Sequence, residues 1–276
     1  MRRLPALLAS KYLMALLMSA FAALPFLWMI FTSVKPPAEV MQAPPTFWPH
    51  TWSFASYVQV WTTGHFFVCF INSILVAGLT TLFSMALATL AGYGFARYRM
   101  PGGHTMLMTI LFTQMFPTIL LAVPFYVLMR QTHLLDTLGG LIIVYTTFAL
   151  PLCTWTMRNY FLTVPVELDE AAMVDGCTPV SALWRVIIPV AAPGMVASSI
   201  FSFILAWNEF MFANTFINTE TLRTLPVGLQ SLIGEYSTDW GMLMAGSVIT
   251  TIPIVLFFLL VQKHLVSGLA AGSVKG

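Results

Sequence analysis

Six apolar runs dominate this sequence, and each is long enough to cross a membrane as a helix. The hydrocarbon core of a bilayer requires about 20 apolar residues in helical form. The runs lie at 12–34, 67–95, 106–128, 138–157, 195–217 and 242–261. Charged residues make up only 8% of the 276 residues, against about 25% in soluble domains. The sequence therefore predicts an all-α, polytopic membrane protein with six transmembrane helices.

The basic residues predict how these spans are oriented. With six spans, the segments on the side of both termini hold nine Lys and Arg residues, and the opposite side holds three. The nine are Arg2, Arg3, Lys11, Arg97, Arg99, Arg158, Arg185, Lys263 and Lys275, and the three are Lys35, Arg130 and Arg223. Because basic loops are retained in the cytoplasm, we expect both termini and the 158–194 segment to be cytoplasmic.

The 158–194 segment concentrates acidic residues in an otherwise apolar chain. Four of the ten carboxylates, Glu167, Asp169, Glu170 and Asp175, fall within nine residues. Pro165 suits a first helical turn, and acids after it favour the positive end of a helix dipole. Gly176 suits the left-handed residue that ends a helix. We expect a short helix, a glycine turn, and a second short helix from Thr178 that ends at Ile188, before Pro189.

Two interpretations of this segment remain open from the residues alone. Ala171 and Ala172 add little bulk, so this helix face could enter a groove of another protein while the acids meet basic groups at its rim. The segment could equally be a solvated loop whose acids only stabilise their own helix. No G-x-x-x-x-G-K-[ST] motif occurs in the sequence, so any ATP would be bound by another polypeptide.

Other candidate groups also have two interpretations. Glu209 and Asn72 are predicted inside spans, where ionisable and polar groups are functional candidates by default. The alternative is structural: Glu209 would hold two helices together, and Asn72 would cap a break. The 35–66 segment, rich in proline and aromatics, suits an interfacial belt or an external docking surface. Cys69, Cys153 and Cys177 are far apart in the sequence, so we expect no disulfide and no metal site.

The cytoplasmic segment resembles a known motif. "EAAMVDG" followed by "VIIP" is similar to the EAA loop of permeases from binding-protein-dependent ABC importers. The matching residues are Glu170, Ala171, Ala172, Gly176, Ile187 and Pro189. Ile188 stands where the family usually has leucine, which leaves the turn and the proline intact.

Further stretches resemble the carbohydrate-uptake group, and specifically MalG-like subunits. They are "FINSILVA" (70–77), "LAGYGFARYR" (90–99), "LLDTLGGLII" (134–143), "AWNEFMFA" (206–213), "TLPVGLQ" (224–230) and the tail "GLAAGSVKG" (268–276). All fall in the order expected of that group, and the resemblance covers nearly the whole chain.

The resemblance implies the type I permease fold of ABC importers, as a single transmembrane permease domain over 1–276. The loop 158–194 would be the EAA coupling loop, with its coupling helices between spans 4 and 5, and 264–276 a cytoplasmic tail. The chain would be no enzyme and would bind no cofactor, because ATP and Mg²⁺ would be held by a partner ATPase. It implies a multi-pass protein of the bacterial inner membrane that imports a di- or oligosaccharide or related carbohydrate by alternating access.

The resemblance also implies partners and contact residues. The partners would be a second, MalF-like permease subunit, two ABC ATPase subunits and an extracytoplasmic solute-binding protein. Residues expected to dock the ATPase are Glu167, Asp169, Glu170, Ala171, Ala172, Asp175, Gly176, Gly272, Val274 and Lys275. For the tail residues the alternative is a frayed terminus. Residues expected along the substrate pathway are Asn72, Trp207, Asn208, Glu209 and Phe210.

Two other classes of function compete with this one. An ion-coupled secondary transporter of a small polar solute usually has more spans or two repeated halves with broken helices. An intramembrane enzyme would need paired catalytic residues inside the spans, and Glu209 stands alone among the predicted spans. Co-purification with an ATPase, against autonomous ion-coupled uptake, would separate the importer from the secondary transporter.

Overall fold

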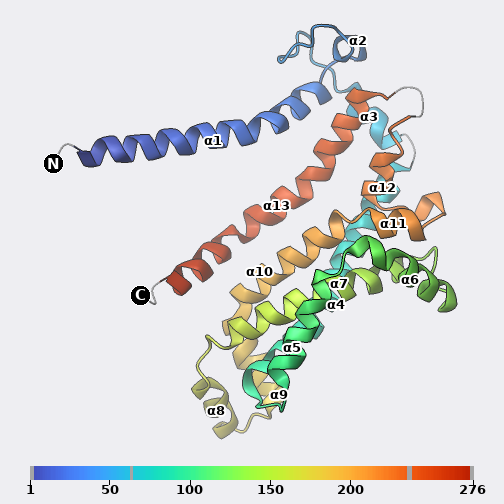
Figure 1. The fold of residues 1–276 in the computed structure, drawn as a ribbon. Coiled ribbons are helices and arrows are strands. Elements are labelled where there is room, and N and C mark those ends of the chain that lie inside the picture. Colours follow the sequence, from blue (N-terminus) through green and yellow to red (C-terminus); the bar gives the residue numbers. More distant parts are fainter. Residues whose placement is uncertain (1–2, 63–64, 235–237, 274–276) are drawn as a thin grey trace. The chain divides into compact units, whose positions relative to one another are not determined.

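The structure is a computed structural model that describes residues 3–62, 65–234 and 238–273, and these residues are almost entirely helical (Figure 1). The order is α1 Arg3–Ser33, α2 Pro37–Val40, α3 Ala55–Thr62, α4 Phe66–Arg97, α5 Gly103–Phe112, η1 Thr113–Met115, α6 Thr118–Gln131, α7 Leu138–Phe161, α8 Glu167–Val174, α9 Pro179–Ala182, η2 Leu183–Ile187, α10 Ile188–Trp207, α11 Met211–Phe216, η3 Glu220–Leu222, α12 Leu225–Gln230 and α13 Trp240–Ser273. The all-α class expected from the sequence is confirmed.

Five helical stretches of the described chain are long and apolar enough to cross a membrane. They are Ser10–Ser33, Phe66–Arg97, Leu138–Phe161, Pro179–Trp207 and Trp240–Leu260. A sixth span results if Gly103–Met115 and Thr118–Gln131 are counted together, since this pair is bent by 99° at a short break. The predicted number of six spans therefore holds with one span broken.

Proline explains the break in the third span, which the sequence predicts as a kinked helix over 106–128. Pro117 has no N–H to donate into a helix and disfavours helical dihedrals in the residue before it. Phe116 accordingly takes an extended conformation, with φ −72° and ψ 130°. Pro25, Pro124 and Pro253 lie inside continuous helices.

The fifth span differs from the prediction at both ends. The apolar run 195–217 is not one helix: α10 ends at Trp207, and α11 begins after a short break. At the other end, Pro189 does not stop the helix that starts at Pro179, because η2 over Leu183–Ile187 is a π-helix that leads directly into α10. A π-bulge rearranges the backbone ladder where a proline lacks its donor.

The chain divides into two compact units, which are described separately. One contains residues 1–67 and 228–252. In it the proline-rich segment after α1 folds against the end of that helix, with the Phe31 and Trp48 rings 4.7 Å apart. Glu39 accepts hydrogen bonds from the Thr46 hydroxyl and the His50 N–H, and these donors, the His50 N–H foremost, lower the pKa of its carboxyl.

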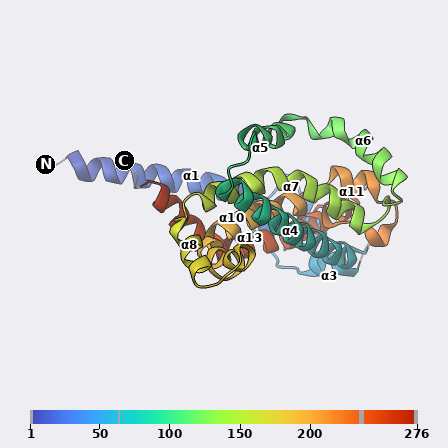
Figure 2. The same ribbon diagram turned by 90° about the horizontal axis from the view of Figure 1, so that it is seen from below.

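The other unit contains residues 68–227 and 253–276, and carries the predicted functional residues described below. Here α7 and α10 pack along one another (Figures 1 and 2). Side chains of α4, α7 and α10 share one apolar core, which includes Ala88, Met157 and Ala191. Gly92 of α4 lies so close to α7 that a Cβ there would be 2.8 Å from the Met157 Cβ. This close approach brings the ends of α4 and α7 together next to α8.

Candidate functional site

The acidic segment forms a short helix followed by a sharp turn. Gly176 has φ +88°, a left-handed conformation that glycine adopts without steric cost. Its N–H donates to the Met173 carbonyl (3.0 Å), and the Cys177 N–H donates to the Ala172 carbonyl (2.9 Å). Thr178 then caps the next helix by accepting from the Ser181 N–H (3.2 Å). The helix, glycine turn and Thr178 cap expected from the sequence are all present.

One face of α8 is fastened to the end of α4 by a buried ion pair. Arg97 Nε donates to Asp169 Oδ2 at 2.8 Å, and the two side chains are only 8% and 7% exposed. The Tyr93 hydroxyl donates to the other carboxylate oxygen at 2.6 Å. Arg97 also donates to the carbonyls of Phe161 (2.9 Å), the last residue of α7, and of Val164 (3.0 Å) just beyond it. Charge-assisted bonds of this kind are the stronger ones in proteins, so α4, α7 and α8 are held as one body.

Two of the residues expected to dock the ATPase lie on this inner face, and their docking role stays a prediction. Asp169 and Ala172 are each 5% exposed and face the rest of the subunit. Asp169 faces inward because it supplies the counter-charge that a buried arginine requires. Nothing in the segment's sequence pattern distinguishes Asp169 from its acidic neighbours, and its partner lies 72 residues earlier in the chain.

The opposite face of α8 is exposed. It carries the predicted residues Glu167, Glu170 and Ala171, and the helix end with Asp175 and Gly176 is exposed too. The sequence interpretation missed Val174, whose side chain is 87% exposed on this small helix. Single exposed apolar residues are common on protein surfaces, so Val174 alone does not distinguish a contact surface from a solvated loop. Its spacing of three and four residues from Ala171 and Glu170 is the signal that could have identified it.

Glu209 lies at the break between α10 and α11, not inside a span. Its carboxylate accepts from the Tyr145 hydroxyl of α7 (2.5 Å) and from the N–H groups of Phe212 (2.9 Å) and Ala213 (3.2 Å). Glu209 therefore caps α11 and ties it to α7. Trp207 is 0% exposed and stacks on Phe203 with ring centroids 5.5 Å apart. Contact of these residues with a substrate stays a prediction.

The other predicted pathway residues are distributed differently. Asn72 is buried in α4 and donates to the carbonyls of Thr221 (3.0 Å) and Arg223 (3.0 Å), which ties α4 to the segment after α11. Asn208 is exposed directly after α10 and donates to the Ile204 carbonyl in the last turn of that helix (2.9 Å). Phe210 is exposed beside the break. The structure thus brings Trp207–Phe210 together and keeps Asn72 with a different loop.

The predicted tail residues are only partly described. Gly272 falls within α13, whereas Val274 and Lys275 lie outside the described residues. Within the described chain no group of His, Cys, Asp and Glu could hold a metal ion, and Cys69, Cys153 and Cys177 form no disulfide.

The fold is that of a transmembrane subunit of an ABC importer. A chain of a bacterial ABC transporter that imports the acidic polysaccharide alginate superposes with a TM-score of 0.82 at 24% identity, covering 95% of this chain and 98% of that one. A chain of the MetNI methionine ABC transporter gives a TM-score of 0.53 at 19% identity, covering 74% of this chain and 91% of that one.

Residues 88–270 match the family described as "Binding-protein-dependent transport system inner membrane component", and the chain belongs to that family. Its relatives include the trehalose transport system permease protein SugB of Mycobacterium tuberculosis, 37% identical over 94% of this chain and 95% of that protein. The trehalose/maltose transport system permease protein MalG of Thermococcus litoralis is 37% identical, covering 95% of both chains. The sulfoquinovosyl glycerol transport system permease protein SmoH of Agrobacterium fabrum is 35% identical, covering 96% of this chain and 93% of that protein.

Proposed function

We propose that this chain is one of two permease subunits of an ATP-driven importer that moves a di- or oligosaccharide or a related carbohydrate by alternating access. Relatives named for trehalose, trehalose/maltose and sulfoquinovosyl glycerol transport support this substrate class. The chain itself is a transport subunit, so ATP and Mg²⁺ belong to separate ATPase subunits. A solute-binding protein would deliver the sugar from outside, and a second permease subunit would complete the pathway.

The exposed face of α8, held in place by the Arg97–Asp169 ion pair, is the observation that carries the coupling role. A partner ATPase that grips Glu167, Glu170, Ala171 and Val174 would move α8, and the buried bonds of Asp169 would transmit that movement to α4 and α7. A flexible loop could not transmit the movement, because it would change its own conformation instead of moving α4 and α7. Gly176 contributes the turn, and the tail residues Gly272, Val274 and Lys275 remain proposed second contacts.

The proposed orientation follows the charge bias of the sequence. An α8 that meets an ATPase faces the cytoplasm, and the nine basic residues on its side of the predicted topology agree with that. We propose a multi-pass protein of the bacterial inner membrane with both termini cytoplasmic.

A cysteine crosslink tests the docking surface directly. Val174→Cys is introduced into a Cys177→Ser background, since Cys69 and Cys153 are already buried. In the complex purified from membranes, we expect a crosslink from position 174 to a subunit that binds ATP. Val58→Cys, exposed in α3 on the predicted opposite side, is the matched control and is expected to give none. A complex with no ATPase, or equal crosslinking from both positions, would refute the coupling role.

Uptake into proteoliposomes tests the driving force and the cargo. We expect transport of a radiolabelled sugar to require internal ATP and external binding protein, and to be unaffected by collapse of ion gradients. Uptake driven by a proton or sodium gradient alone would favour the ion-coupled alternative. A screen of sugars against the purified binding protein would then identify the cargo.

A further inference from the structure

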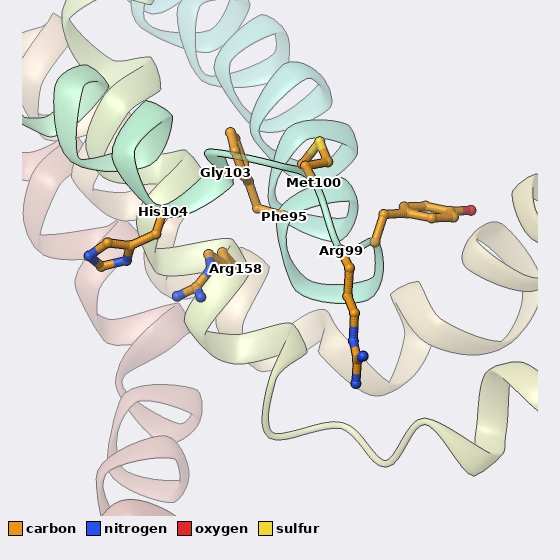
Figure 3. A pocket seen from close by; sticks show the side chains of 7 residues that line it. Phe95, Arg99, Met100, Gly103, His104 and Arg158 are labelled. Atoms are coloured by element: carbon orange, nitrogen blue, oxygen red, sulfur yellow. The ribbon is translucent and has the colours of Figure 1, made fainter.

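A cationic pocket separate from α8 lies where α4 and α7 end and α5 begins. Its volume is about 270 Å³, and it is lined by Phe95, Tyr98, Arg99, Met100, Gly103, His104 and Arg158. Figure 3 shows His104 and Arg158 extending to the same side of the pocket, whereas the Arg99 side chain, on the segment that connects α4 to α5, points away from both. No carboxylate is among these lining residues, although three of them carry or can carry positive charge.

Among the described residues, the two arginines of the pocket differ from the nearby Arg97 in having no carboxylate partner. Arg97 is neutralised by Asp169, whereas neither Arg99 nor Arg158 forms an ion pair within the described chain. The polar contact of Arg158 is with the neutral side chain of Asn159, at 3.3 Å. Two arginines that line one pocket without a counter-charge favour an anion from outside the chain, because guanidinium binds phosphate oxygens in a fork geometry.

The start of α5 adds to the positive potential. This ten-residue helix begins after Gly102, which has a left-handed φ of +73° and supplies no side-chain cap. No acidic residue occupies the first turn of α5. Gly103 and His104 of this first turn line the pocket, so the positive end of the helix dipole is directed at the site.

The rim of the pocket indicates which anion it receives. Tyr98 and Met100, which line the pocket, are exposed large side chains with apolar surface. A soluble phosphate gains nothing from contact with apolar side chains. A phospholipid, in contrast, places its acyl chains on apolar surface and its phosphate in a basic pocket. Basic pockets between helices on the cytoplasmic side bind anionic headgroups in this way.

We propose that Arg99, His104 and Arg158 bind the phosphate headgroup of an anionic phospholipid in the leaflet on the α8 side. The identification of this leaflet as the cytoplasmic one rests on the proposed function. The bound lipid would brace the ends of α4 and α7 next to the Arg97–Asp169 ion pair.

The test measures binding of fluorescent phosphatidylglycerol and phosphatidylcholine to the purified complex. We expect the wild-type complex to prefer phosphatidylglycerol. Arg99→Gln or Arg158→Gln should weaken that binding about fivefold each, and the double variant about thirtyfold, since one basic residue near an anionic surface contributes about 1 kcal/mol. Arg185→Gln, an exposed arginine on the same side, is the matched control and should leave binding unchanged.

Several outcomes would overturn the proposal. Equal binding of both lipids would exclude a site selective for an anionic headgroup, and this comparison uses the wild-type complex alone. Complete displacement of the labelled lipid by millimolar inorganic phosphate would indicate a soluble anion instead. Loss of a protein subunit from the Arg99→Gln/Arg158→Gln complex, with no lipid bound to the wild type, would make the pocket a protein interface. ATPase coupling, measured in parallel, reports separately on the proposed function.

Discussion

Arg97 at the end of α4 and Asp169 in α8 form a buried ion pair at 2.8 Å, across 72 residues of sequence. Through this pair, α8 is bonded to the rest of the helical unit and is not a loosely attached loop. It also separates the two faces of α8: one face is bonded within the subunit, and the other is free to receive a partner.

Removing one member of this pair should be costly. Arg97→Ala leaves a buried carboxylate and two unsatisfied carbonyls, and an unpaired buried charge costs about 3–5 kcal/mol. We expect a lower thermal unfolding temperature for the purified complex and loss of ATPase stimulation by loaded binding protein. Arg185→Ala, in which the arginine is exposed, should change neither quantity. An Arg97→Ala complex with wild-type stability and coupling would contradict the bracing function of the pair.

Gly176 should be sensitive to substitution for a conformational reason. A Cβ at this position would meet no atom within 4 Å, but its φ of +88° is left-handed. Gly176→Ala should therefore cost about 1–2 kcal/mol locally and reduce coupled transport. Gly78→Ala is the matched control: no atom lies within 4 Å there either, and Gly78 is inside α4, where alanine is favoured over glycine. Equal effects at both positions in transport assays would refute the turn argument.

We expect Glu209 to contribute mainly to the folding stability of the subunit and not to substrate binding. Tyr145→Phe removes one hydrogen bond to a charged group, worth about 1.5–3 kcal/mol, and Glu209→Ala removes the cap of α11 as well. We expect lower thermal stability for both variants and an unchanged sugar concentration for half-maximal uptake. A large change in that concentration for Glu209→Gln, with stability retained, would instead indicate substrate contact.

Asp136 should make a loop contact sensitive to acid. Its carboxylate accepts from the Thr219 hydroxyl (2.6 Å) and from the N–H groups of Asn218 and Thr219 (2.9 Å each). These bonds, that of the Thr219 hydroxyl foremost, lower the pKa of Asp136. Because the folded pKa lies below the unfolded value of about 3.9, the stabilisation is fully present above that value. It is lost as the pH falls through the folded pKa.

Hydrogen exchange of Asn218 and Thr219 measures this contact. Protection should be constant at neutral pH and should decrease in acid for the wild type. Asp136→Asn tolerates the left-handed φ of +57° at this position, so it should preserve the turn while removing the acid-dependent change. The same acid profile in wild type and Asp136→Asn would assign the effect to another group.

Local features of the chain were predictable. The apolar runs predict six spans because a bilayer core requires a certain helix length whatever the packing. Pro165, Gly176 and Thr178 predict the helix, turn and cap of the acidic segment because those preferences act within a few residues. The family assignment likewise needed only the order of short motifs.

Long-range pairing was decided only by the tertiary structure. The sequence does not show that Asp169 turns inward to Arg97, that Glu209 caps α11 and bonds Tyr145, or that Asn72 holds the Thr221 and Arg223 carbonyls. These partners are 64 to 151 residues apart, so no periodicity connects them. The break in the third span at Pro117 and the start of the fifth span near Pro189 also depended on backbone bonding. Hydropathy determines which residues enter the membrane; hydrogen bonds between distant polar groups determine which helices move together.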